Sequence, residues 1–162
     1  MKMTTLVAHI RDIILLPGLV TILIPSWIYR FTPEVIPDYI PIKIFSIVLF
    51  MTGLSLFIWT VYLFQRIANG TLAPWTGKNK LVIAGPYQYC RNPMITGILL
   101  ILIAESLWFR SMPILTWAFI FFIINTFYFI LSEEPFLERK FGDEYRQYKR
   151  KVPRWIPRWR SL

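Results

Sequence analysis

The sequence is almost without cysteine and histidine. Among its 162 residues it has one cysteine, Cys90, and one histidine, His9. A single cysteine cannot form an intrachain disulfide, which excludes a disulfide-stapled secreted domain. A zinc centre built from several cysteine and histidine side chains is excluded for the same reason. We therefore expect no metal in the functional site.

Acidic residues are also scarce. Nine Asp and Glu residues stand against 18 Lys and Arg residues, for a net charge of +9. The charges avoid the apolar runs and gather in loops and near the C-terminus. A basic balance can indicate nucleic acid, but in a chain that is 56% hydrophobic it indicates membrane topology and anionic lipid head groups. We expect a membrane protein with no nucleic-acid partner.

Long apolar runs dominate the rest of the chain. About 20 apolar residues suffice to cross a bilayer, and four stretches approach or reach that length. They predict an all-α, polytopic membrane helical bundle that forms one domain over residues 1–162. Residues 1–65 would supply two spans and residues 66–162 a hairpin of two more, with a C-terminal amphipathic helix. The expected spans are residues 13–29, 44–64, 93–109 and 114–131.

Proline and glycine mark the interruptions. Pro17 and Pro25 predict a kink in the first span. Pro135 follows the fourth span, and a residue before proline is disfavoured in helical geometry. We expect the span to end there and a new amphipathic helix to run from Pro135 to about Lys151, weakened at Gly142.

The basic residues predict the orientation of the spans. With four spans, all Lys and Arg residues except Arg30, Lys43 and Arg110 fall on one side. The positive-inside rule places that side in the cytoplasm, with both termini and the loop of residues 65–91. The N-terminal basic residues and first run resemble a signal peptide without a cleavage site, so we expect a retained span.

Two polar clusters flank the hairpin of the third and fourth spans. The first is residues 85–93 and the second is residues 132–135, which contain Glu133 and Glu134. A hairpin brings its ends together, so the clusters should be neighbours. Ionisable groups at a membrane boundary are often functional. Each cluster alone is also compatible with a plain helix end: solvated caps at the glutamates and an ordinary helix start at Asn92.

The clusters together resemble a known family. Residues 85–97 read GPYQYCRNPMITG, which is similar to the G-P-Y and R-H-P-x-Y-x-G signature of the isoprenylcysteine carboxyl methyltransferase and phospholipid methyltransferase family. A glutamate pair follows the next hairpin in that family, as here. Then come F-G-x-E-Y-x-x-Y, matched by residues 141–148, and V-P-R-x-I-P, matched by residues 152–157. The resemblance covers about half of the chain.

The resemblance implies S-adenosylmethionine as the cofactor and a pocket at the cytosolic membrane boundary. A helix N-terminus at Pro93 suits the cofactor's carboxylate, and carboxylates and aromatic rings suit its cationic groups. It assigns no catalytic residue. The implied cofactor-binding residues are Lys80, Leu81, Val82, Tyr87, Arg91, Asn92, Pro93, Met94, Ile95, Gly97, Glu133 and Glu134.

Three positions depart from the family pattern. Asn92 and Ile95 replace a histidine and a tyrosine, and Phe129 replaces a basic residue that carboxyl methyltransferases use to hold the substrate carboxylate. The expected function is an S-adenosylmethionine-dependent methyltransferase for a lipid or lipidated acceptor, resembling isoprenylcysteine carboxyl O-methyltransferases. Two alternatives stay open: a phospholipid amine N-methyltransferase and a non-catalytic lipid-binding protein. A membrane reductase is disfavoured, because no G-x-G-x-x-G turn occurs.

Overall fold

The described residues form a bundle of helices. The structure is a computed structural model and describes residues 14–31, 38–68 and 81–157. All elements in these ranges are helical, which confirms the all-α prediction. They are η1 (Ile14–Leu23), α2 (Ile24–Phe31), α3 (Ile40–Ala68), η2 (Gly85–Gln88), α4 (Pro93–Trp108), α5 (Met112–Tyr128), η3 (Phe129–Glu133), α6 (Glu134–Phe141) and α7 (Asp143–Lys151).

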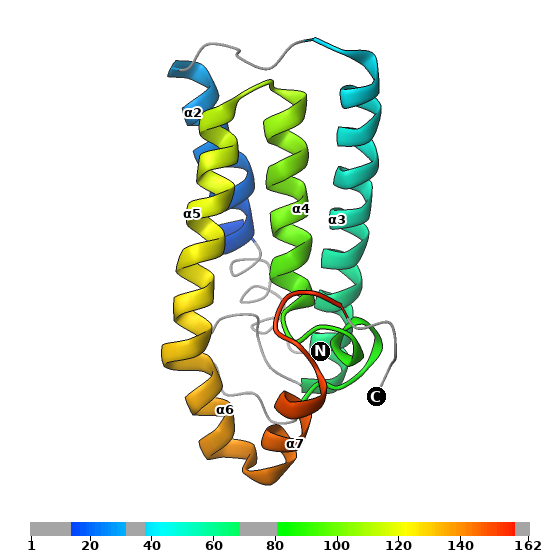
Figure 1. The fold of residues 1–162 in the computed structure, drawn as a ribbon, viewed down its shortest axis with the longest axis vertical. Coiled ribbons are helices and arrows are strands. Elements are labelled where there is room, and N and C mark those ends of the chain that lie inside the picture. The colour runs from blue at the N-terminus through cyan, green and yellow to red at the C-terminus, as the bar shows by residue number, and fades with distance from the viewer. Residues whose placement is uncertain (1–13, 32–37, 69–80, 158–162) are drawn as a thin grey trace, which may run out of the picture.

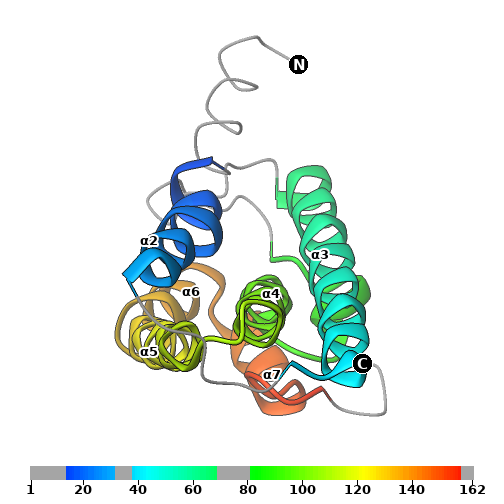
Figure 2. The same ribbon diagram turned by 90° about the horizontal axis from the view of Figure 1, so that it is seen from above.

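Helix α4 lies at the centre, between α3 and α5 (Figures 1 and 2). The α3–α4 contact is close because glycines face each other across it. A Cβ atom on Gly53 would lie 2.7 Å from the Gly97 carbonyl oxygen, and one on Gly97 would lie 2.9 Å from the Gly53 oxygen. Small residues that let backbones approach are typical of helix packing in membranes. This contact holds α3 against the start of α4.

The N-terminal elements pack on the opposite side of the bundle from α3 (Figure 2). Element η1 is a π-helix that contains Pro17, and α2 begins one residue before Pro25. The helix therefore changes its winding between the two prolines. The indole Nε1 of Trp117 on α5 donates a 3.1 Å hydrogen bond to the Val20 carbonyl oxygen. This bond ties η1 to the hairpin of α4 and α5.

The predicted helix end before Pro135 is wrong. Helices α5, η3 and α6 form one continuous path, and Glu134 itself is helical, with φ −63° and ψ −45°. Proline lacks an N–H group and its ring crowds the preceding turn of an α-helix. Here the preceding turn, η3, is a π-helix. A wider turn accommodates the proline without ending the helix.

The predicted single C-terminal helix is also wrong, because Gly142 divides it. Gly142 has φ +55°, a left-handed conformation that favours glycine, and it separates α6 from α7. The break turns α7 back against the end of the bundle (Figure 1). A buried cluster then forms from Leu137 on α6, Tyr145 and Tyr148 on α7, and Val152. Leu81 and Ile83 pack against that cluster.

Two helical stretches are long and apolar enough to cross a membrane. These are Ile40–Ile67 and Met112–Phe141, each with a mean hydropathy of 2.2. Pro93–Trp108 is apolar but shorter. Large apolar side chains on α3 and α5 face outward, as in a lipid-exposed bundle. Exposed examples are Ile44, Phe45, Val48, Met51, Ile58, Phe119, Ile123, Ile124 and Phe127. The four-span count, the orientation and the division at residue 65 stay predictions.

Candidate functional site

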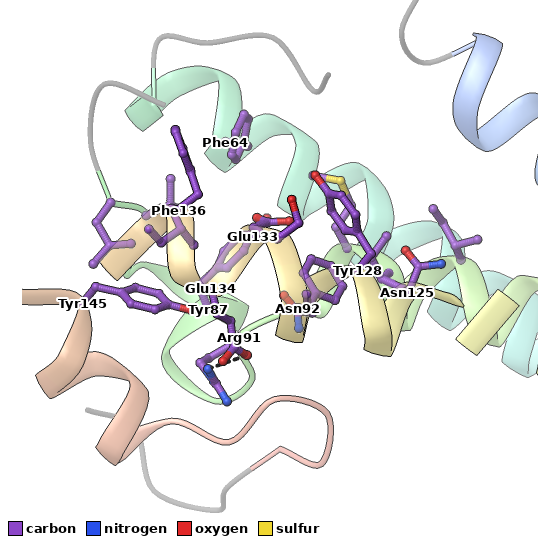
Figure 3. A pocket seen from close by; sticks show the side chains of 18 of the residues that line it. Phe64, Tyr87, Arg91, Asn92, Asn125, Tyr128, Glu133, Glu134, Phe136 and Tyr145 are labelled. Atoms are coloured by element: carbon purple, nitrogen blue, oxygen red, sulfur yellow. Dashed lines mark hydrogen bonds and ion pairs between the residues drawn. The ribbon is translucent and has the colours of Figure 1, made fainter. Parts of the chain in front are cut away.

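A cavity of about 600 Å³ lies between the α3–α4–α5 bundle and the α6–α7 end of the chain. Ligand pockets in proteins are typically about 300 to 1,000 Å³. The lining joins segments that are distant in the sequence (Figure 3). It consists of Pro17, Val20, Phe57, Phe64, Leu81, Val82, Tyr87, Arg91, Asn92, Met94, Ile95, Ile98, Phe121, Asn125, Tyr128, Phe129, Leu131, Ser132, Glu133, Glu134, Phe136, Leu137, Arg139, Tyr145 and Tyr148.

The cavity has a polar end and an apolar end. Its polar groups come from the start of α4 and from the α5–α6 path, among them Asn92, Tyr128 and Glu133 (Figure 3). Its apolar end reaches the middle of the bundle, where Phe57 of α3 and Phe121 of α5 line it. A molecule with a polar head and an apolar chain matches this division.

The start of α4 is formed by Asn92 and Pro93. Helix α4 begins at Pro93, as predicted, and the Asn92 carbonyl oxygen accepts the first backbone bond, from the Thr96 N–H at 3.1 Å. The Asn92 side chain makes no capping hydrogen bond to the helix. The Asn92 amide instead lines the cavity. A carboxamide has two N–H donors and one acceptor, so this side chain can contact a bound polar group.

Glu134 is the centre of a buried ion-pair network. Its carboxyl group accepts hydrogen bonds from Arg91 Nη1 at 2.9 Å and Arg154 Nε at 2.7 Å. Lys149 Nζ lies 3.1 Å from its second oxygen and 2.7 Å from Glu138. Glu134 is 5% exposed, so the pairs form largely outside water. The network joins the loop before α4 to α6, α7 and the segment after α7.

Arg91 is held in place by that network. Its Nη1 points to Glu134, as the dashed line in Figure 3 shows. Its Nε is buried and has no hydrogen-bond partner among the described residues. The Arg91 backbone N–H donates a 2.9 Å hydrogen bond to the Pro153 carbonyl oxygen. The guanidinium therefore lines the cavity in one defined position.

Tyr87 forms one wall through the turn at η2. Gly85 begins this turn with φ +54°, and its hydrogens face Leu63 and Trp59 of α3. Buried Tyr148 donates its hydroxyl to the Tyr87 carbonyl oxygen at 2.7 Å. Burial raises the pKa of both phenols. Both rings therefore stay neutral at physiological pH.

The structure brings most of the predicted site residues to one cavity. Nine of them line it, and Pro93 and Gly97 lie on α4 outside the lining, Gly97 against α3. Lys80 lies outside the described residues. The nine are Leu81, Val82, Tyr87, Arg91, Asn92, Met94, Ile95, Glu133 and Glu134. Their contacts with a cofactor stay predictions.

Sequence reasoning missed the contribution of α5. Asn125 and Tyr128 line the cavity, although the run from residue 114 to 131 reads as a lipid-facing span. A signal was present in Asn125, since polar residues inside an apolar span usually face the bundle interior. Its amide donates a 2.8 Å hydrogen bond to the Phe121 carbonyl oxygen.

Comparison with known proteins identifies the family. The model of the phospholipid methyltransferase family matches residues 41–144, well over half of the chain. The chain is also 44% identical to an uncharacterized protein of Haemophilus influenzae over 63 residues, which are 39% of this chain and the whole of that protein. The matched range contains the start of α4 and both glutamates. The chain belongs to the phospholipid methyltransferase family of membrane enzymes, which methylate lipids.

Proposed function

We propose that the protein transfers a methyl group from S-adenosylmethionine to an amine carried by a lipid. The observation that supports this most directly is a single cavity with a polar end at Asn92 and Glu133 and an apolar end inside the bundle. A soluble cofactor and a lipid can meet in such a cavity. Four spans with both termini in the cytoplasm are part of the proposal, because the polar end then faces the soluble cofactor.

The lining fits the cofactor's chemistry. S-adenosylmethionine carries a sulfonium cation, an ammonium, a carboxylate and an adenine ring. Glu133 can attract a cation, and the rings of Tyr87 and Tyr128 can stack on the adenine or face the sulfonium. The unpartnered Nε of Arg91 is an N–H donor that a carboxylate could satisfy. When bound, the cofactor would supply an activated methyl group.

The protein itself would align the acceptor with the methyl group and exclude water from the reacting atoms. Methyl transfer is a direct displacement, so holding the acceptor nitrogen in line with the methyl group supplies much of the rate. The apolar wall formed by Met94, Ile95 and Phe129 excludes water from the reacting atoms. An ammonium must lose a proton before its nitrogen can attack. The Glu133 carboxylate is the group of the lining that we propose accepts it.

The acceptor is proposed to be an amine rather than a carboxylate. Phe129 stands where carboxyl methyltransferases of similar sequence carry a basic residue, and it packs on Trp155 with ring centroids 5.8 Å apart. Arg91 is engaged by Glu134, and the Nε of Arg139 donates to the Pro135 carbonyl oxygen. An acceptor carboxylate would also lie near Glu133, which repels it.

The test is methyl transfer by the purified full-length chain. The protein, in phosphatidylcholine nanodiscs, is incubated with methyl-labelled S-adenosylmethionine and either an aminolipid or a prenylcysteine. We expect label in the aminolipid that base does not release as methanol, since an N-methyl amine resists alkali and a methyl ester does not. Base-labile product from the prenylcysteine would refute the amine acceptor, and no transfer to either would refute the activity.

Two variants separate binding from chemistry. Glu133→Gln keeps the size of the side chain and removes its charge, so we expect transfer to fall about 100-fold or more, as for removal of a general base. Glu144→Gln is the matched control, because Glu144 is exposed on α7 and does not line the cavity. Titration of Glu133→Gln and Glu144→Gln with S-adenosylmethionine then measures whether either substitution changes cofactor affinity. Full transfer by Glu133→Gln would remove that residue from the mechanism.

A further inference from the structure

A second cavity lies at the other end of α3 and α4. Its volume is about 300 Å³, at the small end of the range for ligand sites. It shares no residue with the larger cavity and is formed where the first turns of α3 meet the last turns of α4. The lining residues are Ser46, Ile47, Phe50, Ala104, Glu105, Trp108 and Phe109. We call this the Glu105 cleft.

Glu105 is the ionisable group of the cleft and is incompletely satisfied. Its Oε2 atom is buried and has no hydrogen-bond partner among the residues that the structure describes. A buried carboxyl oxygen without a donor has lost its hydrogen bonds to water and gained none in return, which destabilises it. Such a group in a cavity suggests that a ligand supplies the donor. For an ionised Glu105, the missing partner is an N–H or O–H group.

Two cations near this end, Lys43 and Arg110, interact with a different carboxylate, Asp38. Lys43 Nζ lies 2.8 Å from Asp38, and the charge of Arg110 also acts on Asp38. The Ser46 hydroxyl donates to the Lys43 carbonyl oxygen at 2.7 Å. The cleft side chains thus leave Glu105 Oε2 without a cationic partner among the described residues.

Aromatic rings form much of the rest of the cleft. Phe50, Trp108 and Phe109 line it, and the Phe109 ring centroid lies 4.9 Å from that of Tyr29. Aromatic faces attract cations, most strongly at sites removed from water. A carboxylate beside aromatic rings is a combination that recognises ammonium groups. The Glu105 Oε2 atom also requires a hydrogen-bond donor, which a quaternary ammonium lacks.

We propose that the Glu105 cleft binds a primary ammonium group. One N–H would donate to Glu105 Oε2, and the adjacent methylenes would contact Phe50 and Trp108. The ligand is either a small free amine or the head group of an aminolipid, which share this chemistry. The cleft lies at the end of α4 away from Asn92 and Glu133, so the bound nitrogen is distinct from the one that the larger cavity would methylate.

The test uses the full chain in phosphatidylcholine nanodiscs, whose lipids carry no N–H on the head group. Isothermal titration, corrected with empty nanodiscs, compares dodecylamine with dodecanol and dodecyltrimethylammonium. We expect dodecylamine to bind at least 10-fold more tightly than either. Ethanolamine, which has no long alkyl chain, is titrated as well. Binding of ethanolamine indicates that the natural ligand is a small free amine. Binding of dodecylamine but not of ethanolamine indicates an aminolipid. Equal affinities for dodecylamine and dodecanol overturn the proposal.

Variants assign the binding to this cleft. Glu105→Gln keeps the size of the side chain and should weaken dodecylamine binding at least 10-fold, with dodecanol unchanged. Glu144→Gln is the charge-matched control and should bind as the unaltered protein does. Glu133→Gln should retain the Glu105-dependent binding, which separates this site from the larger cavity. Unchanged binding in folded Glu105→Gln overturns the proposal, and if that variant does not fold, the ligand series decides.

Discussion

The substitution Glu134→Gln tests the network that holds the C-terminal segment over the cavity. Glutamine keeps the shape of the side chain but removes the charge that Arg91, Arg154 and Lys149 share. We expect the segment after α7 to open more often. The segment covers Cys90, whose thiol donates to the carbonyl oxygens of Arg154 and Trp155 at 3.1 and 3.2 Å. The exposure of this thiol is therefore a direct reporter.

The expected size follows from the burial of the partners. Breaking a fully buried ion pair costs about 3 to 5 kcal/mol. The side chain of Arg91 is 10% exposed, but those of Arg154 and Lys149 are 23% and 39% exposed, so water compensates part of the loss. We therefore expect about 2 to 3 kcal/mol. Since about 1.4 kcal/mol corresponds to tenfold, opening should increase about 30- to 140-fold.

The assay is the rate at which N-ethylmaleimide alkylates Cys90 in the native protein. Burial raises the pKa of this thiol, so alkylation should be slow until the segment opens. Glu138→Gln is the control, because Glu138 also pairs with Lys149 but is about one third exposed, and loss of an exposed pair costs under about 1 kcal/mol. Equal rates in folded Glu134→Gln and the unaltered protein would refute this account of the network.

Two further substitutions test the packing. Gly97→Ala should lower the free energy of unfolding by about 1 to 3 kcal/mol, because its Cβ would meet the Gly53 oxygen. Gly18→Ala should not, since nothing lies within 4 Å of that site, and thermal unfolding in detergent compares the two. Tyr148→Phe should cost about 1 kcal/mol at pH 8 through the lost bond to Tyr87. Burial raises the pKa of Tyr148 above that of an unfolded tyrosine, so its stabilising effect is complete below about pH 10 and declines progressively as the pH rises from there towards the raised pKa of the folded state. The stability difference between the two proteins should therefore shrink in alkaline thermal scans, and a constant difference would contradict this.

The helical elements could be predicted from the sequence because apolar run length is a strong signal. The start of α4 at Pro93 was predictable from local chemistry as well. The end of the last long helix was not. A rule for the residue before proline describes the average α-helix. The π-helical η3 gives Pro135 the room that this rule assumes to be absent.

The meeting of the two polar clusters at one cavity could be predicted because they stand at the two ends of one hairpin. Their convergence follows from topology alone. The different contacts of Glu133 and Glu134 could not be predicted from the sequence, since nothing in it distinguishes two adjacent glutamates. They differ because successive helical residues point about 100° apart. The Glu133 carboxylate faces the cavity, and the Glu134 carboxylate pairs with Arg91 and Arg154.

The pairing of Glu134 with Arg91 and Arg154 explains how residues 141–157 can influence the cavity although few of them line it. Glu134 holds Arg91 beside the cavity and also pairs with Arg154, which follows α7. The turn at Gly142, with its positive φ, brings α7 and Arg154 back towards Glu134. Tyr148 then anchors the turn that carries Tyr87. The glycine, the tyrosine and the arginine therefore act on the cavity through Glu134 and Tyr87. A substitution at Gly142 should therefore change the position of Tyr87 more than it changes the packing of α3, α4 and α5.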